Sequence, residues 1–383
     1  MQPSPYTPGV IARATPGRAQ QLADFDERLS YLVDLHRLNG RIRVDYAPRG
    51  YGKTSLLRQY ERHARDRGVL TVWVTAGEGD LIAQIASAVE RATVSWREDA
   101  RRRIQDHLKE LTFRAGIPAV LGVEATLRSE ASSPPPFGSR AFEDVVREAA
   151  AADDAAGLII LVDEIQAADS DGLRTLAYAW QHLQAEGADV PAAVFAAGLP
   201  NAPDMIGAAV TFSERFAYRP LPPLSPADEE LALALPARQL GVEWDRDAVA
   251  HALAIARGYP YLVQLVGDAA WTAAGRPDAG GRITAADVTA GQRAVDEDLA
   301  ALYRSRWSNA SPKERVMMAA MAGLGDGPVL RKAIAEAMGA DSRALSPIRA
   351  RLLDKGLVQP SGHGALEFTI PGFAAFVRAN ATE

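Results

Sequence analysis

The fold of this chain follows from the stretch YAPRGYGKTSLL, Tyr46–Leu57. A strand-like segment, RIRVDYA, precedes the glycine-rich turn, and a helical pattern begins at the lysine. This order of strand, turn and helix suits phosphate binding, because the amides of the turn and of the first helical residues point at phosphate oxygens. The stretch therefore predicts a nucleotide-phosphate site.

Individual roles in this turn follow from side-chain chemistry. Gly50 and Gly52 permit the backbone angles and the close approach that phosphate binding requires. Lys53 is expected to reach the β- and γ-phosphates, and Thr54 to place its hydroxyl on Mg²⁺. Ala47 replaces the first glycine of the usual pattern, which is acceptable if its φ is negative. The predicted nucleotide-binding residues are Pro48, Arg49, Gly50, Tyr51, Gly52, Lys53, Thr54 and Ser55.

A second stretch, GLIILVDEIQ, complements the first. Its apolar run, Leu158–Val162, reads as a buried strand that delivers Asp163 and Glu164 at its end. Asp163 is the predicted Mg²⁺ ligand, and Glu164 is predicted to polarise the attacking water. A solvated acidic turn is the alternative, but two buried adjacent carboxylates are costly unless a cation or a substrate uses them. Together the two stretches predict an ATP or ADP site with Mg²⁺.

Composition limits the classes of protein that fit. A chain of 383 residues with 48% hydrophobic and 23% charged residues predicts two or three globular domains. The absence of cysteine excludes disulfides and thiolate metal sites. The N-terminal residues lack a signal-peptide core, and the longest apolar runs are too short to span a membrane. A cytoplasmic location without membrane association is expected.

Strand-like and helix-like segments alternate up to about residue 222, and helices follow. This pattern predicts an α/β fold with a parallel sheet covered by helices on both faces. We expect an extended arm at 1–17, a P-loop core at 18–222, a helical lid at 223–305 and a winged-helix domain at 306–383. Residues 96–140 are predicted to form an insertion with a hairpin around Gly122. It contacts a partner or DNA, or is a solvated helix with a connecting loop.

The stretches APRGYGKTSLL, LIILVDEIQ and RGYPYLVQ resemble those of AAA+ and STAND-type P-loop ATPases. The chain is most similar to origin-recognition-like ATP-binding proteins of bacteria and archaea, from about Arg18 to its C-terminus. The resemblance is specific at the two phosphate-site motifs and looser elsewhere. It implies a sheet with an extra strand between the two motifs, here VLTVWVTA at 69–76, then a helical lid and a winged helix.

The resemblance also implies three further site residues. Asn201 follows the segment that corresponds to the family's sensor strand. Arg215 stands where an arginine finger is expected and would neutralise charge on the transferring phosphoryl group; a surface arginine paired with an acid is the alternative. Pro260 matches a proline that packs near adenine, or is simply a helix-start proline. The basic sensor of many initiator ATPases is missing here, although Arg257 is adjacent, and this favours slow hydrolysis.

The C-terminal pattern predicts three helices and a hairpin with its tip at residues 361–364. The first helix opens with a Ser311–Glu314 capping box. On the third helix, the side chains of Arg343, Arg349 and Arg351 are predicted to point outward. His363 is predicted to lie on the wing. Residues 308–383 carry nine Lys/Arg and seven Asp/Glu, whereas the whole chain has a net charge of −6. These four residues are the candidates for contact with double-stranded DNA, and a solvated basic face is the alternative.

Three functions remain open from the sequence. The first is an ATPase that couples its nucleotide state to DNA association and to assembly into a homo-oligomer. The second is a STAND-like signalling switch that acts through a protein partner without DNA. The third is a nucleotide-binding scaffold that barely turns over, which the presence of Lys53, Thr54, Asp163 and Glu164 disfavours.

Overall fold

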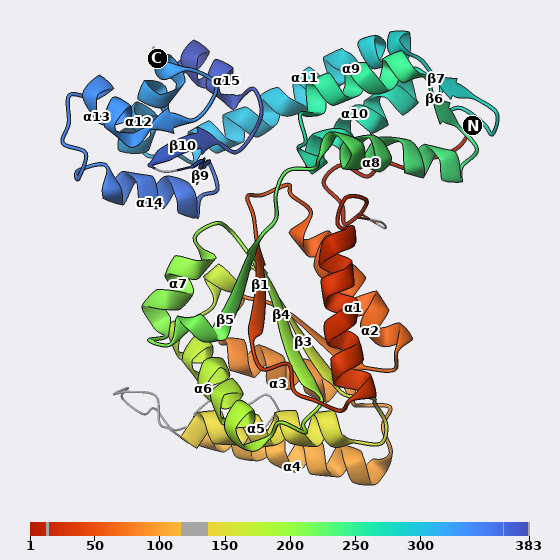
Figure 1. Ribbon diagram of the computed structural model, residues 1–383, viewed down its shortest axis with the longest axis vertical. Coiled ribbons are helices and arrows are strands. Elements are labelled where there is room, and N and C mark those ends of the chain that lie inside the picture. Colours follow the sequence, from red (N-terminus) through yellow and green to blue (C-terminus); the bar gives the residue numbers. More distant parts are fainter. Residues whose placement is uncertain (13–14, 116–136, 363, 382–383) are drawn as a thin grey trace. The chain divides into compact units, whose positions relative to one another are not determined.

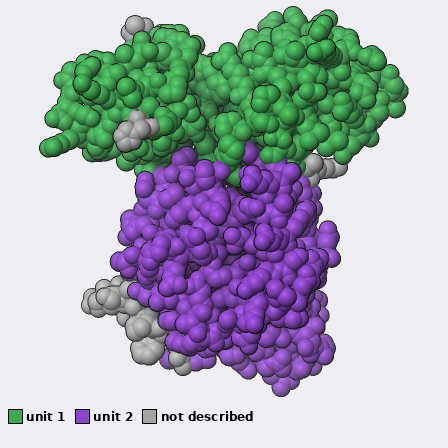
Figure 2. All heavy atoms as spheres, in the orientation of Figure 1, with its two compact units in different colours: residues 1–17, 47–52, 221–383 green, residues 18–46, 53–220 purple. Residues whose placement is uncertain are grey.

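The computed structural model describes residues 1–12, 15–115, 137–362 and 364–381. The chain divides into two compact units, coloured separately in Figure 2. Unit 1 contains residues 1–17, 47–52 and 221–383, and unit 2 contains residues 18–46 and 53–220. The glycine-rich turn is therefore grouped with the C-terminal half of the chain. None of the helices in the described ranges is long and apolar enough to cross a membrane.

Unit 2 is built around a five-stranded parallel sheet in the order β2-β3-β4-β1-β5. This confirms the predicted fold class for the core. The strand that lies between β1 and β3 in space is β4, whereas VLTVWVTA forms the edge strand β2. The extra strand that we expected at 69–76 thus separates the two motifs along the chain but not in the sheet. The strands are β1 (Ile42–Tyr46), β2 (Leu70–Thr75), β3 (Leu158–Asp163), β4 (Ala192–Gly198) and β5 (Phe216–Pro220).

Helices cover both faces of this sheet, with α1 and α2 on one side and α6 and α7 on the other (Figure 1). On the first face, Phe25 of α1 stacks on Tyr60 of α2, and both rings meet Phe195 of β4. The second face is a continuous apolar core shared with α3, α4, α5 and α6. The helices are α1 (Ala19–Asp34), α2 (Lys53–Asp66), α3 (Leu81–Ala92), α4 (Glu98–Ala115), α5 (Phe137–Ala151), α6 (Ser170–Glu186) and α7 (Ala202–Ala209).

Strand β1 carries charges inside the sheet. The guanidinium of Arg43 donates to Asp45 at 3.0 Å, and both side chains are buried. The hydroxyl of Tyr60 donates to the other oxygen of Asp45, also at 3.0 Å. Asp24 of α1 lies 3.6 Å from Arg43. The charges of Arg43 and Asp45 are therefore held in one buried network that joins α1, β1 and α2.

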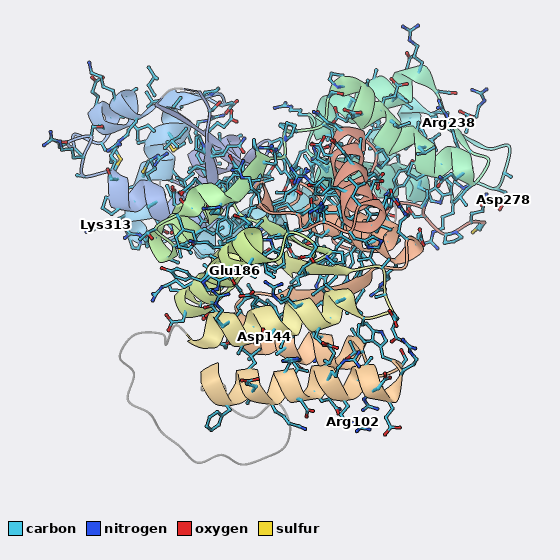
Figure 3. The ribbon with its side chains drawn as sticks, turned by 60° about the horizontal axis from the view of Figure 1, so that its bottom comes forward. Arg102, Asp144, Glu186, Arg238, Asp278 and Lys313 are labelled. Carbon is cyan, nitrogen blue, oxygen red and sulfur yellow. The ribbon has the colours of Figure 1, made fainter. Side chains whose placement is uncertain are left out.

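The segment predicted as an insertion contributes helices to the core. Ile104, Leu108 and Leu111 of α4 are buried against α5, so α4 is not simply a solvated helix. Figure 3 shows the two helices side by side, with Arg102 marking α4 and Asp144 marking α5. The hairpin predicted around Gly122 lies outside the described residues.

Unit 1 begins with the N-terminal residues, of which the described residues 1–12 form no regular helix or strand but are anchored. The ring of Tyr6 is buried, its hydroxyl donates to the carbonyl of Leu233, and Trp244 donates to that hydroxyl. The following helices are α8 (Pro226–Gln239), α9 (Arg246–Ala256), α10 (Pro260–Ala273) and α11 (Ala285–Ser308), and a short parallel pair joins β6 (Glu243–Trp244) to β7 (Arg282–Ile283). Because α11 continues to Ser308, the expected boundary at residue 305 falls inside a helix.

The C-terminal part contains the three predicted helices and the hairpin. The Ser311–Glu314 capping box is present in both directions. Two further elements, β8 and α15, were not predicted; β8 extends the hairpin to an antiparallel sheet in the order β8-β10-β9. The elements are α12 (Pro312–Leu324), β8 (Val329–Leu330), α13 (Arg331–Ala337), α14 (Ser346–Asp354), β9 (Val358–Pro360), β10 (Ala365–Phe368) and α15 (Phe373–Asn380).

Candidate functional site

The glycine-rich turn has the backbone that its sequence predicts. Gly50 and Gly52 have φ values of +83° and +80°, which side-chain-bearing residues rarely adopt. Ala47 is buried and is not among the described non-glycine residues with positive φ, so its methyl group is accommodated. Pro48 and Tyr51 are buried, whereas Arg49 is exposed. The turn therefore has a left-handed backbone at Gly50 and Gly52, and α2 begins at the next residue, Lys53.

The two predicted motifs converge inside unit 2. Thr54, in the first turn of α2, donates its hydroxyl to Asp163 Oδ2 at 2.7 Å, across 109 residues of sequence. Lys53 and Ser55, on either side of Thr54, are buried. The contact forms because β3 ends at Asp163 on the carboxyl edge of the parallel sheet, where α2 begins. This contact brings the two halves of the predicted site together.

Burial gives Asp163 its electrostatic character. Desolvation raises the pKa of this carboxyl group, the hydrogen bond from Thr54 opposes the rise, and the charge of Glu164 adds to it. The other oxygen, Oδ1, accepts the backbone N–H of Glu164 at 3.0 Å. A buried acid beside a second acid is disfavoured as an anion, so this position favours a cation.

Glu164 is held in an unusual backbone conformation. Its φ and ψ are +53° and +39°, the left-handed region, and the 3₁₀ turn η1 (Ile165–Ala167) follows immediately. A non-glycine residue in this region costs on the order of 1 kcal/mol, and such strain often marks functional positions. The reversal brings the side chain of Gln166 back to donate to Glu164 Oε2. Gln166 was quoted in the motif but given no role by the sequence analysis.

Asn201 lies at the same edge of the sheet. It is buried and caps α7, three residues after the end of β4. Because β4 pairs with both β1 and β3, this turn follows the strand between the two motif strands. The structure thus brings Thr54, Asp163, Glu164 and the Asn201 turn to one edge of the sheet.

Arg215 lies at the opposite ends of the strands, beside the amino ends of β1 and β5. It ends the 3₁₀ turn η2 (Ser213–Arg215) and directly precedes β5, whose first residue, Phe216, pairs with Ile42 at the start of β1. Five residues of β5 separate it from the level of Tyr46, roughly 16 Å at about 3.3 Å per residue. Its exposed guanidinium donates to Gln184 of α6. Arg215 is therefore not part of the Thr54–Asp163 cluster of its own chain.

The predicted proline begins a helix that holds the turn. Pro260 is the first residue of α10, after a left-handed Arg257 and Gly258. The neighbouring Tyr259, which the sequence analysis did not select, donates its hydroxyl to the carbonyl of Arg49 at 2.9 Å. The amide of Tyr261 donates to the carbonyl of Gly50 at 3.1 Å. A Cβ on Gly50 would lie 2.2 Å from the Tyr259 hydroxyl oxygen, so contact as well as φ requires glycine here.

The candidate DNA-contacting residues separate into different environments. Arg343 is exposed before α14, and Arg349 is half-buried on that helix. Arg351 is exposed as predicted, with 48% of its side chain accessible, and its Nε also donates to the buried Glu314 of α12 at 3.1 Å. Lys355 donates to the same carboxylate at 2.6 Å. His363 lies outside the described residues.

Two protein-family models match parts of the chain. Residues 15–192 match the AAA ATPase domain, and residues 300–377 match a family described as a domain of unknown function. No protein of curated function matches the sequence. Residues 15–192 are therefore similar to an AAA ATPase domain.

Comparison with solved structures found similar chains at low sequence identity. The ADP form of the ORC2 protein of Aeropyrum pernix is 14% identical, with a TM-score of 0.58 over 99% of this chain and 98% of that one. The ORC1 protein of the same organism, in complex with DNA, is 18% identical, with a TM-score of 0.46 over 98% and 94%. The RuvB Holliday junction branch migration motor of Thermotoga maritima is 14% identical, with a TM-score of 0.44 over 92% and 95%. The chain therefore shares the fold of the ORC2 protein of Aeropyrum pernix.

Proposed function

We propose that this protein is an ATPase that binds Mg²⁺–ATP, hydrolyses it slowly and couples its nucleotide state to DNA association and homo-oligomer assembly. The observation that carries the proposal is the 2.7 Å hydrogen bond between Thr54 and Asp163, which joins the two phosphate-site motifs. The match of residues 15–192 to the AAA ATPase domain supports the ATPase part.

The chain's own groups have distinct roles in this proposal. The amides of residues 50–55 and the ammonium group of Lys53 bind the phosphates. Thr54 and Asp163 fit Mg²⁺, because they present a hydroxyl and a carboxylate oxygen side by side and Mg²⁺ prefers oxygen ligands. The metal, when bound, neutralises charge on the phosphate oxygens. Glu164 accepts the proton of the attacking water.

Slow turnover is proposed because the lid helix α10 lacks a positively charged residue. Helix α10 contains no Lys or Arg, so its first turn supplies no cation to a phosphate. A catalytic site that lacks one positive group stabilises the developing charge of the transition state less well.

Arg215 is proposed to act on a neighbouring molecule. It lies on the edge of the sheet opposite Asp163, so its guanidinium completes the site of a second copy and not its own. An arginine supplied in this way contributes about 10³–10⁵-fold to the rate in well-studied systems. Homo-oligomer assembly thereby becomes part of catalysis.

DNA association is proposed through the C-terminal part, which has the helices and hairpin of a winged helix. Arg343 and Arg351 are exposed and Arg349 is half-buried, so their guanidinium groups are the candidates for phosphate contacts, and Arg351 also supports α14 through its hydrogen bond to Glu314. Alanine at both Arg343 and Arg349 is expected to weaken duplex binding and to reduce its salt dependence. Unchanged affinity and salt slope would remove DNA from the proposal.

A second candidate is a nucleotide switch that signals through a protein partner. It is favoured by the two hydrogen bonds from Tyr259 and Tyr261 to the turn, because these tie the phosphate-binding residues to the C-terminal half of the same chain. Such a tie transmits a change at the nucleotide to α10 without any second copy. The size of the protein with ADP or a slowly hydrolysed ATP analogue, measured with and without DNA, separates the candidates. Assembly only with DNA supports the ATPase on DNA, and assembly regardless of DNA supports the switch.

Mixing variants tests the catalytic part directly. Lys53→Ala is expected to abolish nucleotide binding by calorimetry, and Arg215→Ala to bind nucleotide normally but release phosphate slowly. In a mixture, the Lys53→Ala chain supplies its arginine to an intact site on the Arg215→Ala chain, so activity should recover in part. Equal, background rates for the native chain and Glu164→Gln would instead favour the scaffold.

A further inference from the structure

Gln166 forms a bridge between two segments at the candidate site. Its side chain donates to Glu164 Oε2 and accepts the backbone N–H of Leu199 at 2.9 Å. Leu199 is buried and directly follows β4, in the turn that leads to Asn201. One amide side chain therefore connects the carboxylate at the end of β3 to the end of β4.

The chemistry of the two partners fixes the orientation of this amide. A backbone N–H is only a donor, so the oxygen of Gln166 must face Leu199. The NH₂ group then faces Glu164, whose carboxylate is only an acceptor. Among side chains of this shape, a carboxylate could serve Leu199 but could not donate to Glu164. Glutamine satisfies both partners at once.

The surrounding backbone makes room for the bridge. A Cβ on Gly198 would lie 3.0 Å from Gln166 Oε1 and 2.7 Å from the Cβ of Ala202, so glycine keeps the space open. The left-handed backbone of Glu164 starts the reversal that returns Gln166 toward β4. The glycine at position 198 and the left-handed backbone of Glu164 thus both allow the Gln166 side chain to reach Leu199, and each has a conformational cost.

We propose that Gln166 is a positioning residue for hydrolysis, which holds the carboxylate of Glu164 in one orientation relative to the turn that carries Asn201. The inference rests on the proposed function and adds a residue to it. Gln166 touches neither nucleotide nor water in this role; it acts through Glu164. A fixed base in the correct orientation raises the rate of the chemical step without changing nucleotide affinity.

Three substitutions separate positioning from simple support of the fold. Gln166→Glu keeps an acceptor for Leu199 but loses the donor to Glu164 and adds a like charge. Gln166→Leu loses both bonds. Gly198→Ala leaves the glutamine in place but pushes on its oxygen. The same Glu and Leu changes at the exposed Gln239 of α8 provide matched controls.

The experiment measures single-turnover hydrolysis, nucleotide affinity and hydrogen exchange of the Leu199 amide, followed by NMR on leucine-labelled protein. Gln166→Glu is expected to slow hydrolysis about tenfold with affinity within about twofold of native and the Leu199 amide still protected. Gln166→Leu should slow hydrolysis similarly and also expose the Leu199 amide to exchange. Gly198→Ala should give an intermediate rate, and the Gln239 variants should match the native chain.

A purely structural role predicts another pattern, in which Gln166→Glu is as active as native and only Gln166→Leu is impaired. That result would overturn the proposal, as would equal losses of rate and nucleotide affinity in both variants. Leu199 exchange that is the same in the native chain and Gln166→Leu would show that the bridge is not formed. If the native chain and Glu164→Gln hydrolyse ATP equally slowly, the proposed function fails, and the exchange measurement still reports separately on the bridge.

Discussion

Strands β1 and β3 both end near a buried aspartate, and the two aspartates have different surroundings. Asp45 of β1 is enclosed by the guanidinium of Arg43 and the hydroxyl of Tyr60. Asp163 of β3 receives a neutral hydroxyl and a backbone amide, and an acid follows it. Burial raises the pKa of both carboxyl groups; the charge of Arg43 is the main opposing effect at Asp45, and the Thr54 hydrogen bond is the main one at Asp163. A buried acid paired with a buried cation is structural. Asp163 has neutral hydrogen-bond partners and a second acid beside it, and the charge of Lys53 opposes the rise of its pKa less than the Thr54 hydrogen bond does, so this carboxylate suits a ligand.

The largest expected loss of stability comes from breaking the buried network of Arg43, Asp45 and Tyr60 at β1. Arg43→Met leaves Asp45 as a buried charge without its guanidinium, which should reduce the free energy of unfolding by about 3–5 kcal/mol. Adding Asp45→Leu should recover most of that loss, because neither charge then remains inside. Urea unfolding of the single and double variants measures both. The contrast with β3 would be lost if Arg43→Met were as stable as the native chain.

The same kind of change at β3 should have the opposite sign. Asp163→Asn removes a buried charge that the nucleotide-free protein holds at a cost, so unfolding in the absence of nucleotide should become harder by about 0.5–2 kcal/mol. The stabilisation that Mg²⁺–ATP gives the native chain should disappear in this variant. Thermal melts with and without Mg²⁺–ATP measure the two effects. A variant that is less stable without nucleotide and still responds to Mg²⁺–ATP would contradict the assignment.

The pH dependence sharpens this comparison. The folded-state pKa of Asp163 lies above its unfolded value, so the folded chain binds more protons in the window between the two. Stability contributed by the protonated group is fully present below the unfolded pKa and is lost as the pH rises through the folded pKa. The stability of Asp163→Asn minus that of the native chain should therefore grow across the acid range and level off above it. A constant difference at every pH would show that the pKa of Asp163 is not raised.

The smallest effect concerns a third buried acid, Glu314, which resembles Asp45. Burial tends to raise the pKa of Glu314. Hydrogen bonds from Lys355 and the Ser311 backbone amide outweigh this effect and hold the pKa below its ordinary value. Arg351→Ala removes one of its two cationic partners and leaves Lys355, so a loss below about 1 kcal/mol is expected. Arg343→Ala, at an exposed position, is the control and should leave the unfolding midpoint unchanged. A larger loss for Arg343→Ala than for Arg351→Ala would reverse the assignment of these arginines.

Sequence alone predicts the parts of this protein that depend on contiguous residues. The turn at Gly50–Gly52, the apolar strand before Asp163 and the capping box at Ser311 each lie within one short stretch. Chemistry that depends on a few neighbouring residues is visible in the order of those residues.

The features that sequence did not predict join distant segments. The strand between β1 and β3 is β4, because packing of whole helices and strands sets the order in the sheet. The hydrogen bond from the exposed Arg351 to the buried Glu314 joins two different helices. Gln166 could have been noticed as a polar side chain directly after two acids at a strand end. Its partner at Leu199, however, is known only from the folded chain.

The placement of Arg215 and Asp163 on opposite edges of one sheet has a consequence for stoichiometry. On the proposed mechanism each molecule holds a phosphate cradle and lends its arginine to the next. A linear row of n copies then contains n − 1 complete catalytic centres, whereas a closed ring contains n. A lone molecule would be silent, two would share one working centre, and specific activity would rise with the length of the row until closure made every centre equivalent.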